Sequence, residues 1–220
     1  MTYTQNVISR FSENSNPENI KPMSDYMKGK FEYFGIKTPQ RREISKEIFT
    51  EFGLPDEENF VTIVKELWSE PQRELHYFAL DLINKIQKKL SGNYLEVWEY
   101  LIITNSWWDS VDGIASNIIG DHFVKYKSDK IPVTRKWMDS GNIWLQRSAL
   151  LFQLKYKKAT DVEILDTYIR ELASSKEFFI QKAIGWILRE YSKSNPDWVR
   201  QFVMKIKLAS LSYREATKYV

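Results

Sequence analysis

The chain has 220 residues, eight glycines, seven prolines and no cysteine, which is long enough for one substantial core and excludes disulfides, thiolate–metal sites and cysteine nucleophiles. Its net charge of +3 is uneven: residues 1–140 hold 18 Lys and Arg against 21 Asp and Glu, whereas residues 141–220 hold 14 against 8. The basic C-terminal third favours a polyanionic partner, although charge runs more often mark solvated helix faces. Because no Gly/Ser-rich linker interrupts the chain, we expect a single domain over residues 1–220.

Apolar residues recur at helical spacing along nearly the whole chain, and strand-like alternation is almost absent. The pattern predicts an all-α protein of about a dozen helices, each roughly 10–20 residues long. Pro and Gly signals predict the breaks between helices, which fall at Asn16-Pro17, Thr38-Pro39, Gly53-Leu54-Pro55, Ser91-Gly92, Ile131-Pro132, Gly141-Asn142 and Asn195-Pro196.

Two further features concern location and metals. No segment approaches the roughly 20 consecutive apolar residues of a membrane span, and residues 1–14 lack the layout of a signal peptide. We therefore expect a cytoplasmic protein with no membrane association. With only His76 and His122 available, we expect no histidine-built metal site.

A weak internal repeat relates the segments 72–85, 145–158 and 180–193, each of which opens with polar and basic residues and continues with apolar ones. Its period is 35 residues, which falls in the range of two-helix solenoids of the HEAT kind. The repeat predicts antiparallel helix pairs stacked into a curved solenoid, with a basic concave face; a compact bundle is the alternative. Three polar residues occupy matching positions one repeat apart: Asp112, Arg147 and Lys182.

The segment Ser106-Trp107-Trp108-Asp109-Ser110-Val111-Asp112 is the most informative for chemistry. Ser106 and Asp109 have the spacing of a capping box, which predicts a helix start and a structural role for Asp109. Trp108 and Asp112 are four residues apart, so an indole and a carboxylate share one helix face. Such a carboxylate suits the stabilisation of a neighbouring cation. We expect Trp107 to pack in the core and Trp108 to face a surface.

Five strings of the chain are long and chemically distinctive: MSDYMKGKFEYFGIKTPQRR (23–42), SWWDSVD (106–112), IWLQRSALLFQLKYK (143–157), EFFIQKAIGWILREYSKSNPDWV (177–199) and REATKY (214–219). They strongly resemble the AlkD family of DNA alkylation repair glycosylases, from about residue 15 to the end of the chain. The resemblance implies HEAT-like helical repeats curved around duplex DNA.

Carried over residue by residue, the resemblance makes Asp112 the catalytic carboxylate and places Trp108 and Trp186 on either side of the damaged nucleotide. It implies that Arg147 holds a backbone phosphate and that Tyr26 completes the cleft. The remaining DNA contacts that it implies are Thr38, Arg42, Lys155, Lys182 and Arg189. It also implies attack on the sugar without base flipping.

These residue types suit the removal of an alkylated purine. Alkylation at N3 or N7 makes the base cationic, so the leaving group needs no proton. As the bond to the sugar breaks, a fixed carboxylate stabilises the positive charge that develops on the deoxyribose. Tryptophan faces attract the cationic nucleoside. The catalytic motif contains no lysine for a Schiff base, so we expect a monofunctional glycosylase. We also expect a monomer, and nothing in the sequence calls for a cofactor or a metal.

Two other classes of function fit the same sequence. One is a non-catalytic helical-repeat module that binds nucleic acid by charge and shape, and the other is a protein-interaction scaffold. The basic C-terminal third and the Trp108–Asp112 pair argue against the scaffold. An aspartate in a basic cleft argues against a pure DNA binder, unless Asp112 forms a structural salt bridge with Arg147.

Overall fold

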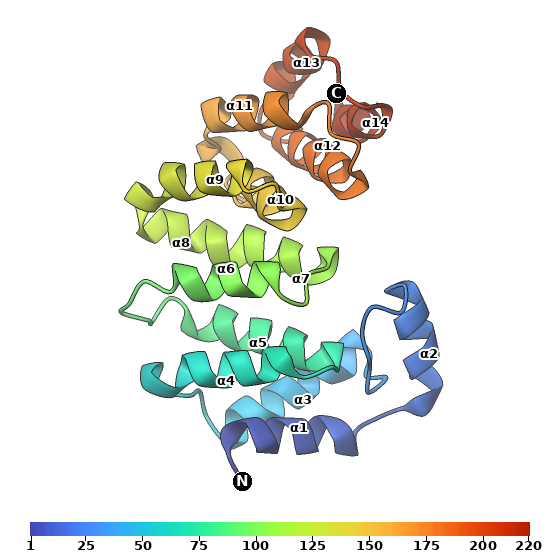
Figure 1. Cartoon of the computed structure of the whole chain (residues 1–220), viewed down its shortest axis with the longest axis vertical. Helices are drawn as coiled ribbons and strands as arrows, with labels where there is room; N and C mark the ends of the chain where they lie inside the picture. Colours follow the sequence, from blue (N-terminus) through green and yellow to red (C-terminus); the bar gives the residue numbers. More distant parts are fainter. The chain divides into compact units, whose positions relative to one another are not determined.

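The computed structural model describes residues 1–220 and contains α-helices α1 to α14, short 3₁₀ turns, one π-helical segment and no β-strand beyond an isolated bridge between Glu32 and Gln72 (Figure 1). The all-α prediction is therefore confirmed. No helix is both long enough and apolar enough to cross a membrane. The chain divides into two compact units, Met1–Asn93 and Tyr94–Val220.

The first unit contains five helices, whose buried faces carry large apolar side chains such as Phe11, Phe60 and Phe78. A buried carboxylate organises the segment before the third helix: Glu74 accepts hydrogen bonds from the backbone N–H groups of Phe34, Gly35 and Ile36. The helices are α1 (Tyr3–Glu13), α2 (Pro17–Tyr26), α3 (Thr38–Glu51), α4 (Glu57–Ser69) and α5 (Arg73–Ile86).

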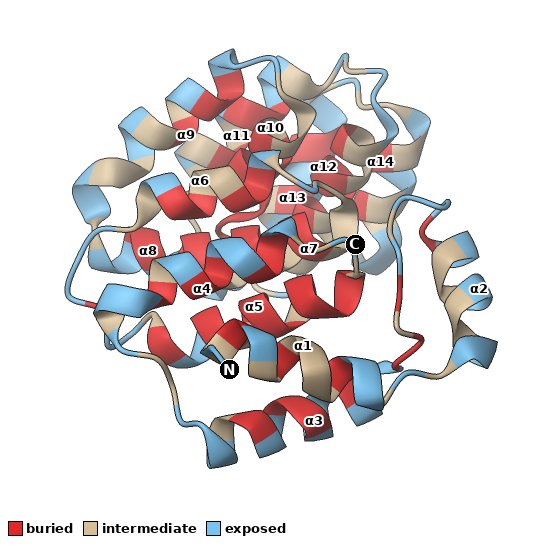
Figure 2. Cartoon of the chain, turned by 60° about the horizontal axis from the view of Figure 1, so that its bottom comes forward, coloured by how far each residue is buried: buried red, intermediate tan, exposed pale blue.

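The buried residues of the second unit, coloured red in Figure 2, include Trp137, Leu150 and Leu188. The second unit contains the remaining helices. They are α6 (Leu95–Ile103), α7 (Trp108–Gly113), α8 (Gly120–Lys125), α9 (Lys130–Asp139), α10 (Ile143–Leu151), α11 (Val162–Leu172), α12 (Phe178–Ser192), α13 (Pro196–Lys205) and α14 (Ser210–Ala216). The π-helical segment Ile114–Ile119 joins α7 to α8 without a break.

Helical hairpins recur along the chain. Three-residue connections join α4 to α5, α9 to α10 and α12 to α13, and the two helices of each pair pack on one another. Such short connections make neighbouring helices antiparallel. Within the second unit, α10 contacts both α7 and α12, so helices about one repeat apart in sequence are neighbours in space. This arrangement confirms the helical-repeat prediction.

Three local predictions need correction. Ser106 does not cap α7: the N-cap residue is Trp107, no side chain caps the helix, and the Ser106 hydroxyl instead donates to the Ile102 carbonyl at the end of α6. Pro132 does not break a helix, because it lies in the first turn of α9, where no intrahelical N–H bond is required. The repeat segment 145–158, expected to be helical like 72–85 and 180–193, is only partly so, because α10 ends at Leu151.

The early end of α10 has a local cause. Gln153 exchanges hydrogen bonds with the backbone of Asp161, its amide donating to the carbonyl and its side-chain oxygen accepting from the N–H. Lys157 then adopts a φ of 54°, which is incompatible with a continuing right-handed helix. Side-chain-to-backbone bonds of this kind compete with regular helix and cannot be read from apolar periodicity.

Candidate active site

Helix α7 presents Trp108 and Asp112 on one face because its other face is buried. Ser110 and Val111 are fully buried, whereas Trp108 and Asp112, which are four residues apart, lie together on the opposite face. Trp107, just before the helix, is half-buried and packs against Trp144 and Phe179, with ring centroids 5.8 and 5.0 Å away. The sequence predicts Trp107 in the core and Trp108 at a surface. Both are half-buried, so Trp107 packs against aromatic neighbours without being a fully buried core residue.

Helices α7, α10, α12 and α14 together line a pocket of ≈330 Å³. That volume is near the lower end of the range for small-ligand sites. The pocket brings together all three residues of the 35-residue repeat, and with them both predicted tryptophans. Its lining residues are Trp108, Asp112, Arg147, Phe178, Phe179, Lys182, Trp186, Arg189 and Glu215.

An ion pair joins Asp112 and Arg147 at the base of this site. The Arg147 Nε donates to Asp112 Oδ1 at 2.6 Å and Nη2 donates to Oδ2 at 2.8 Å, while Nη1 donates to the Phe179 carbonyl. The Arg147 side chain is 4% exposed and the Asp112 side chain 14%. The guanidinium is thus fully engaged within the chain, and the carboxylate retains contact with the pocket.

Electrostatics at Asp112 reflect two opposing effects. Burial raises the pKa of the Asp112 carboxyl above its ordinary value, the Arg147 guanidinium lowers it, and nearby Asp109 adds to the rise; the net direction is upward. Both carboxylate oxygens nevertheless accept N–H bonds from a guanidinium, which is the geometry of the ionised form. The site therefore holds a negative charge in a poorly hydrated position.

Helix α12 contributes five of the lining residues, and three of them form a single stripe. Ile180, Ala183, Ile184, Ile187 and Leu188 are buried, which leaves Lys182, Trp186 and Arg189 on the other face at spacings of four and three. Trp186 is half-buried, as is Trp108. Trp108 from α7 therefore lines the same pocket as Asp112, together with Lys182, Trp186 and Arg189 from α12.

The other predicted site residues lie elsewhere. Lys155 is exposed and donates to the Asn117 side-chain oxygen, and it does not line this pocket. In the first unit, Tyr26 and Thr38 line a separate pocket of ≈420 Å³, and Tyr26 is 67% exposed. Arg42 is an exposed residue of α3 outside both pockets.

Sequence reasoning missed three residues of the pocket. Phe178 and Phe179 begin α12 and lie in the string 177–199, but the resemblance assigns no role to either residue. Glu215 lies in the string REATKY, where nothing in the local pattern indicates a contact with α12. Its pocket position depends on the packing of α14 against α12, which only the folded chain shows.

Fold and site together define an all-α helical-repeat protein with a pocket lined by an aspartate, two tryptophans and the cations Arg147, Lys182 and Arg189. The sequence matches the family described as DNA alkylation repair enzyme over residues 7–220. The chain belongs to this family, and its role is in DNA repair. The match begins within α1, earlier than the resemblance noted from residue 15.

Among solved structures, the chain is similar to a protein described as a predicted DNA alkylation repair enzyme from Enterococcus faecalis. The two sequences are 32% identical, the similarity covers 94% of this chain and 96% of the other, and the TM-score is 0.86. A search of curated proteins finds no match. Since the similarity spans nearly all of both chains, it supports assignment of the whole chain to this family.

Proposed function

We propose that this protein is a monofunctional DNA N-glycosylase that hydrolyses the bond between deoxyribose and a cationic N3- or N7-alkylated purine in duplex DNA. The observation that carries the proposal is the position of Asp112, a carboxylate 14% exposed that lines a pocket with Trp108 and Trp186. An anion in a poorly hydrated aromatic site is suited to stabilise a neighbouring cation.

The pocket supplies every protein group that the hydrolysis requires. The bond between C1′ and the base nitrogen breaks, and its electron pair leaves with the base, whose positive charge is thereby neutralised. The Asp112 carboxylate stabilises the oxocarbenium-like sugar. A water molecule then bonds to C1′, and its proton passes to Asp112 or to solvent. The products are a free alkylated purine and an abasic site.

The tryptophans and cations would have separate roles in this reaction. The faces of Trp108 and Trp186 attract the cationic nucleoside by about 0.5–2 kcal/mol through cation–π contact. Lys182 and Arg189 bind phosphate groups next to the lesion and position the duplex without reading its sequence. Tyr26, Thr38, Arg42 and Lys155 supply further DNA contacts, as the resemblance implies. Arg147 would orient Asp112. The phosphate contact that the resemblance implies for Arg147 does not fit a side chain that is 4% exposed and whose guanidinium donates to Asp112 and to the Phe179 carbonyl.

Attack from the backbone side, without base flipping, is part of the proposal because the family resemblance implies it. A fluorescent 2-aminopurine placed next to the lesion tests this step. Without flipping, its stacking and therefore its quenched emission should persist in the complex. A large rise in emission on binding would contradict this part of the proposal.

One observation favours a second candidate, a DNA-binding protein without catalysis. The bidentate Asp112–Arg147 pair has the geometry of a structural salt bridge, and this alone would account for a buried aspartate. On that reading the family's DNA-repair role would be one of recognition, with base removal left to another protein.

Incubation with duplex DNA that carries a single 7-methylguanine separates the two candidates. The glycosylase proposal predicts free 7-methylguanine in solution and a strand that breaks only after alkali treatment. Strand breakage without alkali would indicate a lyase and contradict the monofunctional assignment. Tight binding without release of base would support the non-catalytic candidate.

A further inference from the structure

Glu215 lies between the two cations that flank Trp186 on α12. The Lys182 Nζ is 3.3 Å from Glu215 Oε1, and the Arg189 Nη1 donates to Oε2. Each carboxylate oxygen therefore accepts from a different cation. Because Lys182 and Arg189 lie seven residues apart, one side chain from α14 spans two turns of α12.

The backbone fixes Glu215 in this position. Gly185 faces α14 so closely that a Cβ there would lie 2.6 Å from the Glu215 Cβ and 3.0 Å from the Ser212 carbonyl oxygen. The buried Ser212 hydroxyl also donates to the Gln181 carbonyl at 2.9 Å. Glycine at position 185 thus allows the close approach that lets a glutamate reach both cations.

The environment keeps Glu215 ionised. Burial alone would raise the pKa of this carboxyl, but the cations of Lys182 and Arg189 lower it below its ordinary value. Its side chain is 17% exposed, against 39% for Lys182 and 23% for Arg189. The ionised Glu215 carboxylate, which is mostly covered, holds the Lys182 and Arg189 side chains in defined rotamers. Without such a partner, Lys and Arg side chains sample many rotamers.

We propose that Glu215 is a positioning residue, which holds Lys182 and Arg189 on either side of Trp186 in the free protein and keeps them in that geometry while they contact DNA phosphates. The inference rests on the proposed function, because it assigns phosphate binding to these cations. It has two consequences of opposite sign. Glu215 opposes the binding of any DNA through its charge, and it speeds the reaction by fixing the geometry of the cations.

Glu215→Gln, which removes the charge and keeps the size, tests both consequences. Affinity for undamaged duplex at low salt should rise about threefold. This is the effect expected from removing one negative charge that lies some 7 Å from a phosphate in water-like surroundings. The rate of 7-methylguanine release at saturating protein should fall about tenfold, because the cations are no longer fixed. Glu215→Asp retains the charge, so its affinity should match the wild type while its rate stays reduced.

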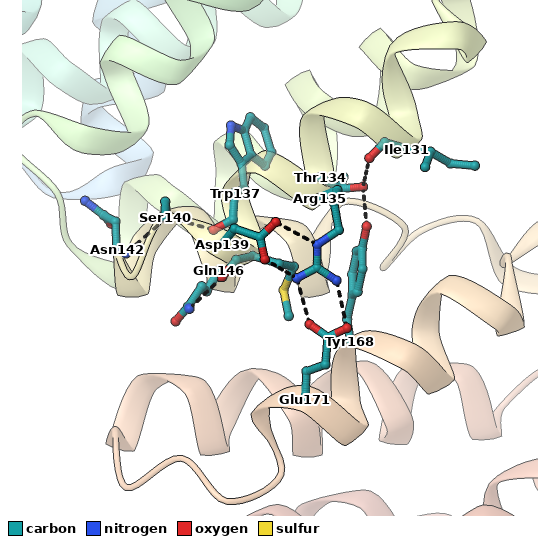
Figure 3. Close-up of polar contacts among 11 residues, drawn as sticks. Ile131, Thr134, Arg135, Trp137, Asp139, Ser140, Asn142, Gln146, Tyr168 and Glu171 are labelled. Carbon is teal, nitrogen blue, oxygen red and sulfur yellow. Dashed lines mark hydrogen bonds and ion pairs between the residues drawn. The ribbon is translucent and has the colours of Figure 1, made fainter.

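A matched control is available in the same unit. Glu171 accepts a two-point ion pair from Arg135, which also binds Asp139, on α9 and α11 (Figure 3). None of these three residues lines the pocket. Glu171→Gln therefore removes one arginine-paired carboxylate without touching the proposed site, and its DNA affinity and rate should equal those of the wild type.

A third readout does not depend on activity. The guanidinium ¹⁵N signals of Arg189, assigned with Arg189→Lys, should show restricted rotation in the free wild-type protein and free rotation in Glu215→Gln. If the wild type releases no base, the proposed function fails, while the affinity and NMR measurements still judge Glu215. Wild-type affinity and rate in Glu215→Gln would overturn the inference. So would a joint fall in melting temperature, affinity and rate, because that pattern means the carboxylate only braces α14.

Discussion

The ion pair between Asp112 and Arg147 offers a quantitative test of how the pocket is held together. Arg147→Met removes the guanidinium but retains most of the apolar stem. It removes the hydrogen bonds to three acceptors: both Asp112 oxygens, at 2.6 and 2.8 Å in the intact pair, and the Phe179 carbonyl. Both ionic side chains are largely covered, so the loss is that of a buried rather than a surface pair.

Breaking a buried pair by removing one partner costs about 3–5 kcal/mol. Arg147→Met should lie near 3 kcal/mol, because Asp112 keeps some water contact and its raised pKa makes protonation easier. Asp112→Asn should cost less, since the amide oxygen still accepts one bond. The double variant should be more stable than the sum of the two losses indicates, with a coupling energy of about 2 kcal/mol.

Urea unfolding at neutral pH measures these four free energies of unfolding. The exposed pair Arg170–Asp166 serves as a control, with side chains 45% and 35% exposed, and its coupling should be only about 0.3–0.5 kcal/mol. If the Asp112–Arg147 coupling is no larger than that of the control, the pair does not hold the pocket and this reasoning is wrong.

Three further predictions concern pH, ligand charge and the first unit. Burial raises the pKa of Asp112, and the reaction needs the ionised form of this carboxyl. The rate of base release should therefore fall on acidification, with a midpoint above the ordinary carboxyl pKa of about 3.9. A midpoint at or below that value would contradict the prediction. Trp186→Leu should weaken binding to DNA with a cationic lesion by about 2- to 30-fold, and the affinity for abasic DNA should be nearly unchanged. Titrations with both duplexes measure these affinities. Equal losses of affinity for the two duplexes would argue against cation–π contact. Glu74→Gln should lower the free energy of unfolding by about 2 kcal/mol. The reason is that one amide oxygen replaces two carboxylate oxygens, which together accept three backbone N–H bonds. An unchanged melting temperature would show that Glu74 does not stabilise this segment.

The sequence predicted the helices well because their apolar periodicity reports burial directly, as with Ile180, Ile184, Ile187 and Leu188 of α12. The 35-residue spacing also anticipated that Asp112, Arg147 and Lys182 meet in one pocket, since equivalent positions of stacked repeats are neighbours.

Other features depend on tertiary or side-chain interactions that no local pattern encodes. Ser106 could equally cap α7 or bond to α6, and the folded chain selects α6. Glu215 reaches the pocket only because Gly185 lets α14 approach α12. Asp112 is both the partner of Arg147 in a salt bridge and a residue that lines the pocket, so a structural role and a position in the site coexist in one carboxylate.

Single-turnover release of 7-methylguanine from duplex DNA by the wild type and by Asp112→Asn tests the central claim most directly. The variant removes the negative charge from the pocket while keeping the size of the side chain. The account predicts a rate lower by about 10²–10³-fold, the usual loss for a preorganised electrostatic group, with DNA affinity unchanged or tighter because an anion has left a basic site. Base release by Asp112→Asn at the wild-type rate would show that this carboxylate is not the catalytic group.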